Sequence, residues 1–350
     1  MLINSENLQK LMYEVLKKCD LSEQDAEVAA EVLIQADLRG IDTHGAIRLP
    51  IYVKRLQLGL VSPRPVIKFV RETDTTAIVD GDFGLGHVTS YKAMKIAIEK
   101  ASRHGLAAVG VRNSHHNGAA AYYAQMALEH DMIGFSCTNS PPLMPAPGGA
   151  DKVVGNNPFA IAVPAGKELP LVLDMACSLV AQGKVMLAMK KGEPIPQGWA
   201  TDNKGIPTAD AAAGLKGFLL PAGGYKGYCM AIIVDALAGV LTGAAFGKGV
   251  TSIYGDLINK QNAGHFFMAI KVSNFMEPDI FKGLIDSYIR EIKSTPLTSG
   301  TDEVFMPGEK EYRTKATRSA EGINMAAAVV DDLLKMAADV GVNGKAILGI

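Results

Sequence analysis

Residues 107–118 have the sequence AAVGVRNSHHNG. The first five are small or apolar and predict a buried strand, and the polar residues that follow predict that the strand ends in a turn. Residues 118–130 come next and have the pattern of a helix. A strand that leads through a polar turn into a helix is typical of α/β folds, which place reactive groups at such turns.

The same alternation extends over most of the chain. Short β-rich runs predict strands at 66–70, 76–79, 107–112, 133–138, 159–163, 172–174 and 266–272. Helical patterns predict helices at 90–104, 118–130, 179–190, 227–241, 278–292 and 322–338. The polar, Gly- and Pro-containing segment 192–219 predicts a long ordered loop. We therefore expect an α/β fold with several irregular connections.

The N-terminal region differs from this pattern. Two amphipathic helices are expected in the first forty residues, and a third over about 46–58. Ser5 is expected to cap the first helix, and Ser22 with Asp25 resembles the capping-box start of the second. Gly40 is expected to end the second helix. The sequence thus predicts a helical N-terminal region joined to an α/β part.

Composition limits the classes of partner. The chain has 350 residues with 35 Lys and Arg against 36 Asp and Glu, which gives a net charge of -1. This balance provides no basic surface for nucleic acid or for an anionic membrane. The N-terminus has no apolar core of the signal-peptide type, so we expect a cytoplasmic protein. Residues 228–247 contain one charge, Asp235, and their many small residues predict a buried helix rather than a membrane span.

The cysteines give no sign of a metal or redox site. Cys19, Cys137, Cys177 and Cys229 lie far apart and form no CxxC pair. This spacing argues against a zinc knuckle and against a thioredoxin-type pair. We expect buried, reduced thiols.

A candidate carboxylate-binding group lies between residues 44 and 52. If a helix begins near Gly45, then His44, Arg48 and Tyr52 follow one another at intervals of four and share one face. Arg offers a permanently charged, planar guanidinium that can bind both oxygens of a carboxylate. The Tyr hydroxyl and the imidazole would complete the acid-binding site. The alternative is a surface helix with an ordinary Arg and a core Tyr, and this window alone favours that alternative.

A candidate acid–base group follows the strand at 107–112. His115 and His116 lie in the turn, and imidazole has a pKa suited to removing the proton of an alcohol during hydride transfer. The positive end of the following helix would disfavour the imidazolium. Adjacent histidines rarely bind one metal ion and no second cluster has ligand spacing, so we expect no metal. One of the two histidines is expected to be structural.

Glycine-rich turns supply candidate anion sites. The turn at 223–227, GGYKG, opens the apolar helix and combines free backbone N–H groups with the Lys226 ammonium, which suits a phosphate. Asp174 closes an apolar strand and could receive a ribose hydroxyl. A Rossmann fingerprint is absent, because Gly84 and Gly86 lack a third glycine and follow what we interpret as a turn between strands. Each glycine turn alone is most often only a turn.

With these residues in hand, the sequence resembles the malate/L-lactate dehydrogenase family that is unrelated to the Rossmann-type enzymes of the same names. That family also includes ureidoglycolate and sulfolactate dehydrogenases, diketogulonate reductase and cyclic-imine reductases. The resemblance covers nearly the whole chain, and the motifs occur in the family's order. They are HGxxRxxxY at 44–52, SHHxG at 114–118, TNSPP at 138–142, GxNPxAxAxP at 155–164, DMA at 174–176, GxKGY at 224–228 and PGE at 307–309.

The resemblance implies a non-Rossmann, mixed-sheet nucleotide-binding domain with a second α/β lobe, an NAD or NADP cofactor, and a homodimer or higher homo-oligomer. His116 would be the catalytic acid–base with His44 at the same site, and Arg48 and Tyr52 would hold the substrate. The residues expected to contact the cofactor are Ser140, Asp174, Met175, Ala176, Lys226, Pro307, Gly308 and Glu309.

We expect four segments. They are an N-terminal helical part of the substrate lobe at 1–60, an α/β segment at 61–120, an atypical NAD(P)-binding domain at 121–275, and a C-terminal helical segment at 276–350 that packs back on the first lobe. Thr43, Tyr225 and Cys229 depart mildly from the family pattern. Pro141 stands where a ureidoglycolate enzyme carries an acidic residue, which favours a simpler acid.

The predicted activity is hydride transfer between a nicotinamide cofactor and a small 2-hydroxy or 2-oxo acid, which is malate- or lactate-like, with ureidoglycolate as a further candidate. A cyclic 2-imino acid reductase is the alternative within the same fold. A non-catalytic nucleotide-binding protein and a metal-dependent hydrolase are the alternatives from other classes, and both leave the His44, Arg48, Tyr52 and His116 set unexplained.

Overall fold

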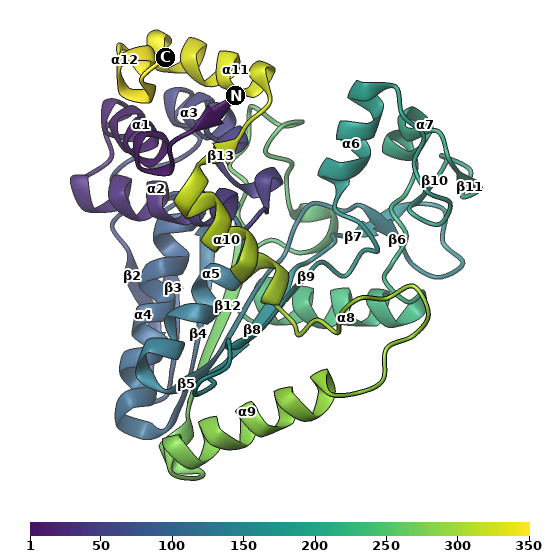
Figure 1. The fold of residues 1–350 in the computed structure, drawn as a ribbon. Helices are drawn as coiled ribbons and strands as arrows, with labels where there is room; N and C mark the ends of the chain where they lie inside the picture. The colour runs from purple at the N-terminus through teal and green to yellow at the C-terminus, as the bar shows by residue number, and fades with distance from the viewer.

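The centre of the molecule is one mixed β-sheet of seven strands (Figure 1). The computed structural model describes residues 1–350, apart from the side chain of Lys190. In spatial order the strands are β2 (Lys68–Glu72), β3 (Thr76–Asp80), β4 (Leu106–Ser114), β12 (Ala263–Lys271), β5 (Met132–Thr138), β8 (Phe159–Val163) and β9 (Leu171–Met175). Each predicted strand overlaps one of these seven, so the strand predictions and the mixed α/β class are confirmed.

Strand direction and register fix which loops meet. β3 and β4 are parallel, and every other neighbouring pair of the sheet is antiparallel. β12 lies between β4 and β5, and its first residue, Ala263, pairs with Ser114 at the end of β4. The loop that precedes β12 therefore lies beside the loop that follows β4.

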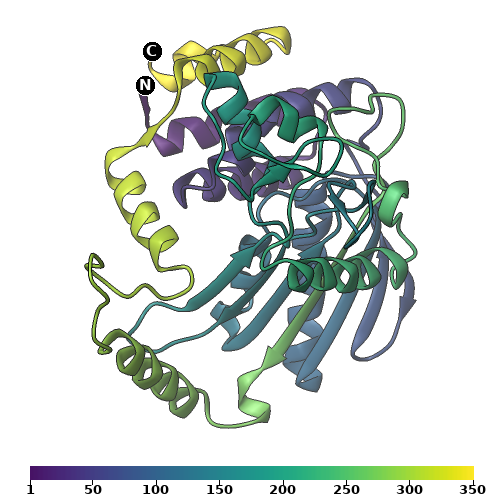
Figure 2. The same cartoon turned by 90° about the vertical axis from the view of Figure 1, so that its right-hand side faces the viewer.

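Helices cover both faces of the sheet. On one face α4 (Gly86–His104) and α5 (Ala120–Met126) bury Met94 and Tyr123 against Val109 and Phe267. On the other face α8 (Tyr225–Asp235) and a π-helical turn (Ala236–Val240) lie across the strands (Figure 2). The alternating side chains of the strands thus enter two separate apolar layers.

The N-terminal helices form a lobe with the C-terminal ones. α1 (Ser5–Lys18), α2 (Glu23–Leu38), α3 (Leu49–Gln57), α11 (Ala327–Asp339) and α12 (Gly344–Leu348) share one apolar core. β1 (Leu2–Ile3) pairs with β13 (Ile323–Asn324), so the start of the chain lies beside the segment that leads into α11. Ser22 caps α2 as predicted, through the Asp25 N–H, whereas Asn4 rather than Ser5 caps α1.

Segments between β5 and α8 form a second lobe, which lies at the same end of the strands as the N-terminal lobe (Figure 1). It contains β6 (Met144–Pro145), β7 (Lys152–Val154), α6 (Gln182–Lys191), β10 (Ala200–Thr201), β11 (Pro207–Thr208) and α7 (Ala211–Lys216). The predicted loop at 192–219 includes the last three of these elements. α9 (Pro278–Lys293) lies apart below the sheet, and α10 (Glu309–Glu321) leads back to the N-terminal lobe (Figure 1).

Three predictions are corrected. The segment 228–247 is not buried on all sides, because Ala231 and Val234 pack inward while Ile233 is 60% and Leu241 57% exposed. Cys229 on the same helix is exposed and Cys19 half-buried, so only two of the four free thiols are buried. The turn after β3 leads into α4 rather than into another strand.

No helix in the described part of the chain is long and apolar enough to cross a membrane. The cytoplasmic location stays a prediction.

Close packing of α5 on β5 leads to a stability prediction. A Cβ atom on Gly134 of β5 would lie 2.0 Å from the carbonyl oxygen of Ala124, so Gly134→Ala should lower the free energy of unfolding by about 1–3 kcal/mol. Gly283→Ala on α9 is the matched control, since nothing lies within 4 Å of its Cβ position, and it should stabilise by about 1 kcal/mol. Urea unfolding measures both. Equal stability of the two variants would contradict the packing described here.

Candidate active site

The segment from His44 to Tyr52 is not one helix, which corrects the sequence prediction. A 3-10 turn (Asp42–His44) ends at Gly45, a second 3-10 turn (Ala46–Arg48) follows, and α3 begins at Leu49. The break has a physical cause, because the buried Asp37 carboxylate accepts the Ala46 N–H at 2.7 Å. A Cβ on Gly45 would lie 2.0 Å from that carboxylate, so only glycine fits.

His116 is held by three contacts in the loop between β4 and α5. Its Nδ1 lies 2.6 Å from the Tyr52 hydroxyl and accepts a longer bond, 3.3 Å, from the Gly118 N–H. Its own backbone N–H donates to Gln261 Oε1 at 2.7 Å. The long Gly118 bond favours the tautomer that carries its proton on Nε2, whereas the Tyr52 hydroxyl, which can donate or accept, is compatible with either neutral tautomer.

The surroundings keep His116 neutral. Burial lowers its pKa well below the ordinary value, and the nearby positive charge of Arg48 lowers it further. His44, whose ring lies 5.5 Å from that of His116 in a stacked arrangement, has a pKa lowered to about 3 by burial and by Arg48. A neutral imidazole at neutral pH can accept a proton, which an alcohol oxidation requires.

Arg48 lies near these rings, and two of its guanidinium nitrogens are already hydrogen-bonded within the protein. Its Nε donates to the Thr43 carbonyl at 2.6 Å, and its Nη1 donates to the Tyr254 hydroxyl at 2.8 Å. The guanidinium also lies over the Tyr254 ring, 5.2 Å from the centroid. The bond to Thr43 occupies the Nε edge, so a carboxylate can approach only the Nη1 and Nη2 end.

The structure therefore brings the four predicted residues of the first two groups together. The rings of His44 and Tyr52 stack with that of His116, and the positive charge of Arg48 acts on all three groups. Tyr52 is 2% exposed and its hydroxyl is engaged by His116. Its hydroxyl thus faces His116 rather than the open side of the site.

The predicted cofactor residues lie along the β5, β8 and β9 side of the sheet. Ser140 Oγ donates to Asn156 Oδ1 at 2.7 Å, and the Asn156 carbonyl accepts the Cys177 N–H at 2.7 Å. Asp174, Met175 and Ala176 directly precede Cys177 at the end of β9. The Cys177 carbonyl accepts the Ala222 N–H at 2.9 Å, which connects this strand end to the glycine turn.

The glycine turn has the geometry that the sequence suggested. Gly223 and Gly224 have φ angles of 61° and 67°, in the region that favours glycine, and α8 begins at Tyr225. The first N–H groups of a helix have no partner within it, and Lys226 is exposed beside them. Free N–H groups, helix polarity and an ammonium at one point fit a phosphate group.

The turn at 307–309 lies against β9. The Pro307 carbonyl accepts the Val172 N–H at 2.9 Å, and Gly308, with a φ of 85°, packs on Val172. The Glu309 carboxylate is 7% exposed and bonds to Lys293 at 2.7 Å and to Arg313. Its carboxylate is therefore used inside the protein, whereas the backbone of the turn lies beside the strand that ends in Asp174.

The chemistry of these residues fits a dinucleotide. The anion-type turn, the exposed Asp174 carboxylate and the Ser140 hydroxyl lie on connected elements, and they match the phosphate and hydroxyl groups of such a cofactor. Among the described residues, no group of three or more His, Cys, Asp or Glu side chains could hold a metal ion.

Sequence reasoning missed four residues of the site. Tyr254, Gln261 and Arg55 belong to the contacts around Arg48 and His116. His87, fully buried, lies edge-on to Tyr52 with ring centroids 4.9 Å apart. Only Arg55 carried a local signal, since it follows Tyr52 by three residues on α3.

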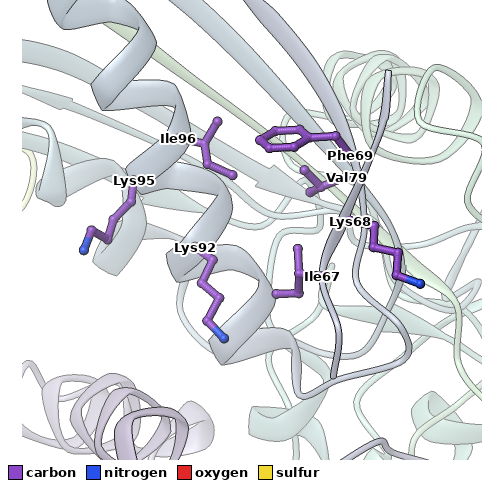
Figure 3. Close-up of a pocket in the computed structure, with 7 residues that line it drawn as sticks. All are labelled: Ile67, Lys68, Phe69, Val79, Lys92, Lys95 and Ile96. Atoms are coloured by element: carbon purple, nitrogen blue, oxygen red, sulfur yellow. The ribbon is translucent and has the colours of Figure 1, made fainter. Parts of the chain in front are cut away.

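A hollow elsewhere on the molecule is separate from this site. It measures about 290 Å³ and lies between α4 and the β2–β3 hairpin (Figure 3). Its lining is Ile67, Lys68, Phe69, Val79, Lys92, Lys95 and Ile96. None of the predicted site residues is among them.

Comparison with known proteins shows the family of the chain. The profile of the family described as Malate/L-lactate dehydrogenase matches residues 3–334. Malate dehydrogenase of Pyrococcus abyssi is 42% identical over 98% of this chain and 96% of its own length. NAD(+)-dependent ureidoglycolate dehydrogenase of Escherichia coli strain K12 is 34% identical over 95% of this chain and 94% of its own.

A solved structure gives the same result. Sulfolactate dehydrogenase from Methanocaldococcus jannaschii superimposes with a TM-score of 0.92 at 39% identity, over 99% of each chain. Sequence and fold agree over nearly the whole chain. The chain belongs to the malate/L-lactate dehydrogenase family.

Proposed function

We propose that this dehydrogenase interconverts a small 2-hydroxy acid and its 2-oxo acid by hydride exchange with a nicotinamide dinucleotide, with His116 as the proton carrier. The observation that carries the proposal is the neutral His116, bonded through Nδ1 to Tyr52, beside the partly open guanidinium of Arg48. When bound, the nicotinamide accepts or supplies the hydride.

Arg48 holds the substrate carboxylate. The bond of its Nε to Thr43 leaves the Nη end for the two carboxylate oxygens and fixes the direction of approach. This orientation aligns C2 of the acid with His116, and holding the reacting groups in place supplies part of the acceleration.

His116 transfers the proton through Nε2. Since Nδ1 is bonded to Tyr52 and Gly118, Nε2 is the ring atom left for the substrate. In oxidation the tautomer that carries its proton on Nδ1, donated to the Tyr52 oxygen, accepts the hydroxyl proton at Nε2, and in reduction the imidazolium returns that proton to the oxo oxygen. The Tyr52 hydroxyl can donate or accept and therefore supports the ring in either tautomer. We accordingly propose that Tyr52 supports the His116 ring rather than binding the carboxylate, and that His44 lines the site beside His116.

The connected turns would hold the cofactor in this proposal. Lys226 and the start of α8 receive a phosphate, and Ser140 and the segment 174–176 receive hydroxyl and amide groups. The turn at 307–309 contributes through its backbone, since the Glu309 carboxylate is engaged. These positions support a cofactor domain over 121–275, with the turn at 307–309 added to it from outside. The proposal covers NAD and NADP alike.

The substrate class is tested directly. Oxidation of NADH and NADPH is followed optically with oxaloacetate, pyruvate, 3-sulfopyruvate, oxalurate and a cyclic 2-imino acid in parallel. Pro141 favours a malate- or lactate-like acid. Turnover with the imine alone would replace the proposal by imine reduction, and tight cofactor binding with no turnover would favour a binding protein.

His116→Ala should abolish turnover while NADH still binds. Removal of the proton carrier typically costs 10²–10⁴-fold, roughly, in rate. Steady-state kinetics and the fluorescence of bound NADH give the two readouts. His104→Ala, at the exposed end of α4, is the matched control and should retain full activity. Undiminished turnover in the His116 variant would exclude the proposed role.

The pH profile of oxidation follows from the pKa of His116. Because burial and Arg48 lower this pKa, the base form persists as the pH falls. We expect kcat/KM for the hydroxy acid to stay level from about pH 8 down to about pH 6, below the ordinary midpoint of imidazole. A loss of activity with a midpoint at the ordinary value would mean that His116 titrates as a solvent-exposed residue.

We also propose that the chain assembles into a homo-oligomer. The exposed apolar face of α8 and the following turn supports this, with Ile233, Val240 and Leu241 each more than half exposed. Contiguous exposed apolar surface of this kind commonly marks an interface. Ile233→Glu should shift the mass measured by light scattering towards the monomer, and a monomeric wild type would contradict the proposal.

A further inference from the structure

We propose that the loop 251–261 is a substrate-binding element of the active site, in which Tyr254 provides a second contact to the substrate carboxylate and the buried Arg55 is the positioning residue. This inference rests on the proposed function, because it assumes a carboxylate on Arg48.

The loop is attached to α3 by a buried arginine. Arg55 is 1% exposed, and its guanidinium donates to three loop carbonyls: Nη1 to Asp256 at 2.6 Å and to Ile253 at 3.4 Å, and Nη2 to Asn259 at 2.9 Å. No carboxylate pairs with Arg55 among the described residues, and its Nε has no partner. Burying a guanidinium without a carboxylate partner is unfavourable, even with carbonyl acceptors. Such a costly arrangement points to a required loop conformation.

The loop also has an internal framework. The Asp256 carboxylate accepts the N–H groups of Ile258 and Asn259 at 2.9 and 2.7 Å. The Ser252 hydroxyl accepts those of Tyr254 and Gly255. These bonds turn the Asp256 and Asn259 carbonyls towards Arg55, so one guanidinium fixes the whole loop.

Two loop residues reach the catalytic groups. Tyr254 bonds to Arg48 Nη1, and Gln261 accepts the backbone N–H of His116. The next residue, Asn262, accepts the Asn113 N–H at 3.0 Å and joins the two loops again. Arg55 therefore influences the carboxylate group and the proton carrier through one element.

Tyr254 has a hydrogen-bond donor left for a ligand. Its oxygen accepts from Arg48, so its own O–H is free to donate. The residue is 49% exposed, and its hydroxyl lies at the Nη end of Arg48, the end left open by Thr43. A carboxylate there would receive one bond from the guanidinium and one from the phenol.

The first test is Tyr254→Phe, which keeps the ring over Arg48 and removes only the hydroxyl. We expect KM for the accepted 2-oxo acid to rise about tenfold, the usual effect of losing one hydrogen bond to a charged group, with kcat within about twofold. The affinity for NADH should not change. Tyr288→Phe, at an exposed position on α9, is the matched control. An unchanged KM in Tyr254→Phe would overturn the role of Tyr254.

The second test is Arg55→Lys, with Arg55→Met as a stronger change. Release of the loop should raise KM and lower kcat together, because both Tyr254 and Gln261 move. Tyr254→Phe should then raise KM less in the Arg55→Lys background than it does in the wild-type protein. Thermal melting and NADH binding separate this effect from unfolding. If Arg55→Lys loses stability while kcat, KM and the Tyr254 effect stay as in wild type, Arg55 only stabilises the fold and the positioning role is excluded.

A binding measurement separates failure of this inference from failure of the proposed function. If wild type turns over none of the acids, calorimetry with oxamate, an unreactive 2-oxo acid analogue, on the NADH complex still tests the loop. Weaker oxamate binding in Tyr254→Phe supports the loop role without the reaction, and equal binding rejects it.

Discussion

The position of β12 in the sheet is the constraint on which the active site depends. This strand, from late in the chain, lies between β4 and β5 and is antiparallel to both. The pairing of Ala263 with Ser114 sets the start of β12 beside the end of β4. The loop with Tyr254 and Gln261 therefore meets the loop with His116, and a shift of one residue would turn His265 and its neighbours to the opposite face.

Buried polar side chains near the start of β12 and the end of β4 form a hydrogen-bonded network. The buried His265 bonds through Nδ1 to Thr138 at 2.7 Å and through Nε2 to Ser114 at 2.8 Å, so it connects β12 to both neighbouring strands. Ser114 in turn contacts Thr89 of α4 at 2.6 Å. Burial lowers the pKa of His265 to about 3 and keeps the ring neutral. A buried network with its hydrogen bonds satisfied gives the His116 loop a fixed base.

Local sequence patterns predicted the strands and the chemistry of individual segments. All seven strands were found because each is a short apolar run between turn residues, and His116 was found because it follows such a run. The helix through His44, Arg48 and Tyr52 was wrong, since the carboxylate of Asp37 breaks it at Gly45. α10 was missed because its sequence is almost entirely polar and has no apolar stripe. The contacts of Arg55, Tyr254 and Gln261 join residues about 145 to 206 positions apart, and no local periodicity reports such contacts.

The late position of β12 also affects how the protein is made. When β4 and β5 have left the ribosome, the strand that separates them is still more than a hundred residues away in the sequence. Until it arrives, both strands carry unpaired edges with apolar side chains, which are templates for pairing with other chains. Synthesis of this protein therefore includes a long interval in which the nascent sheet is open at its centre. The yield of folded protein in a cell should depend on chaperones and on the rate of translation over that interval.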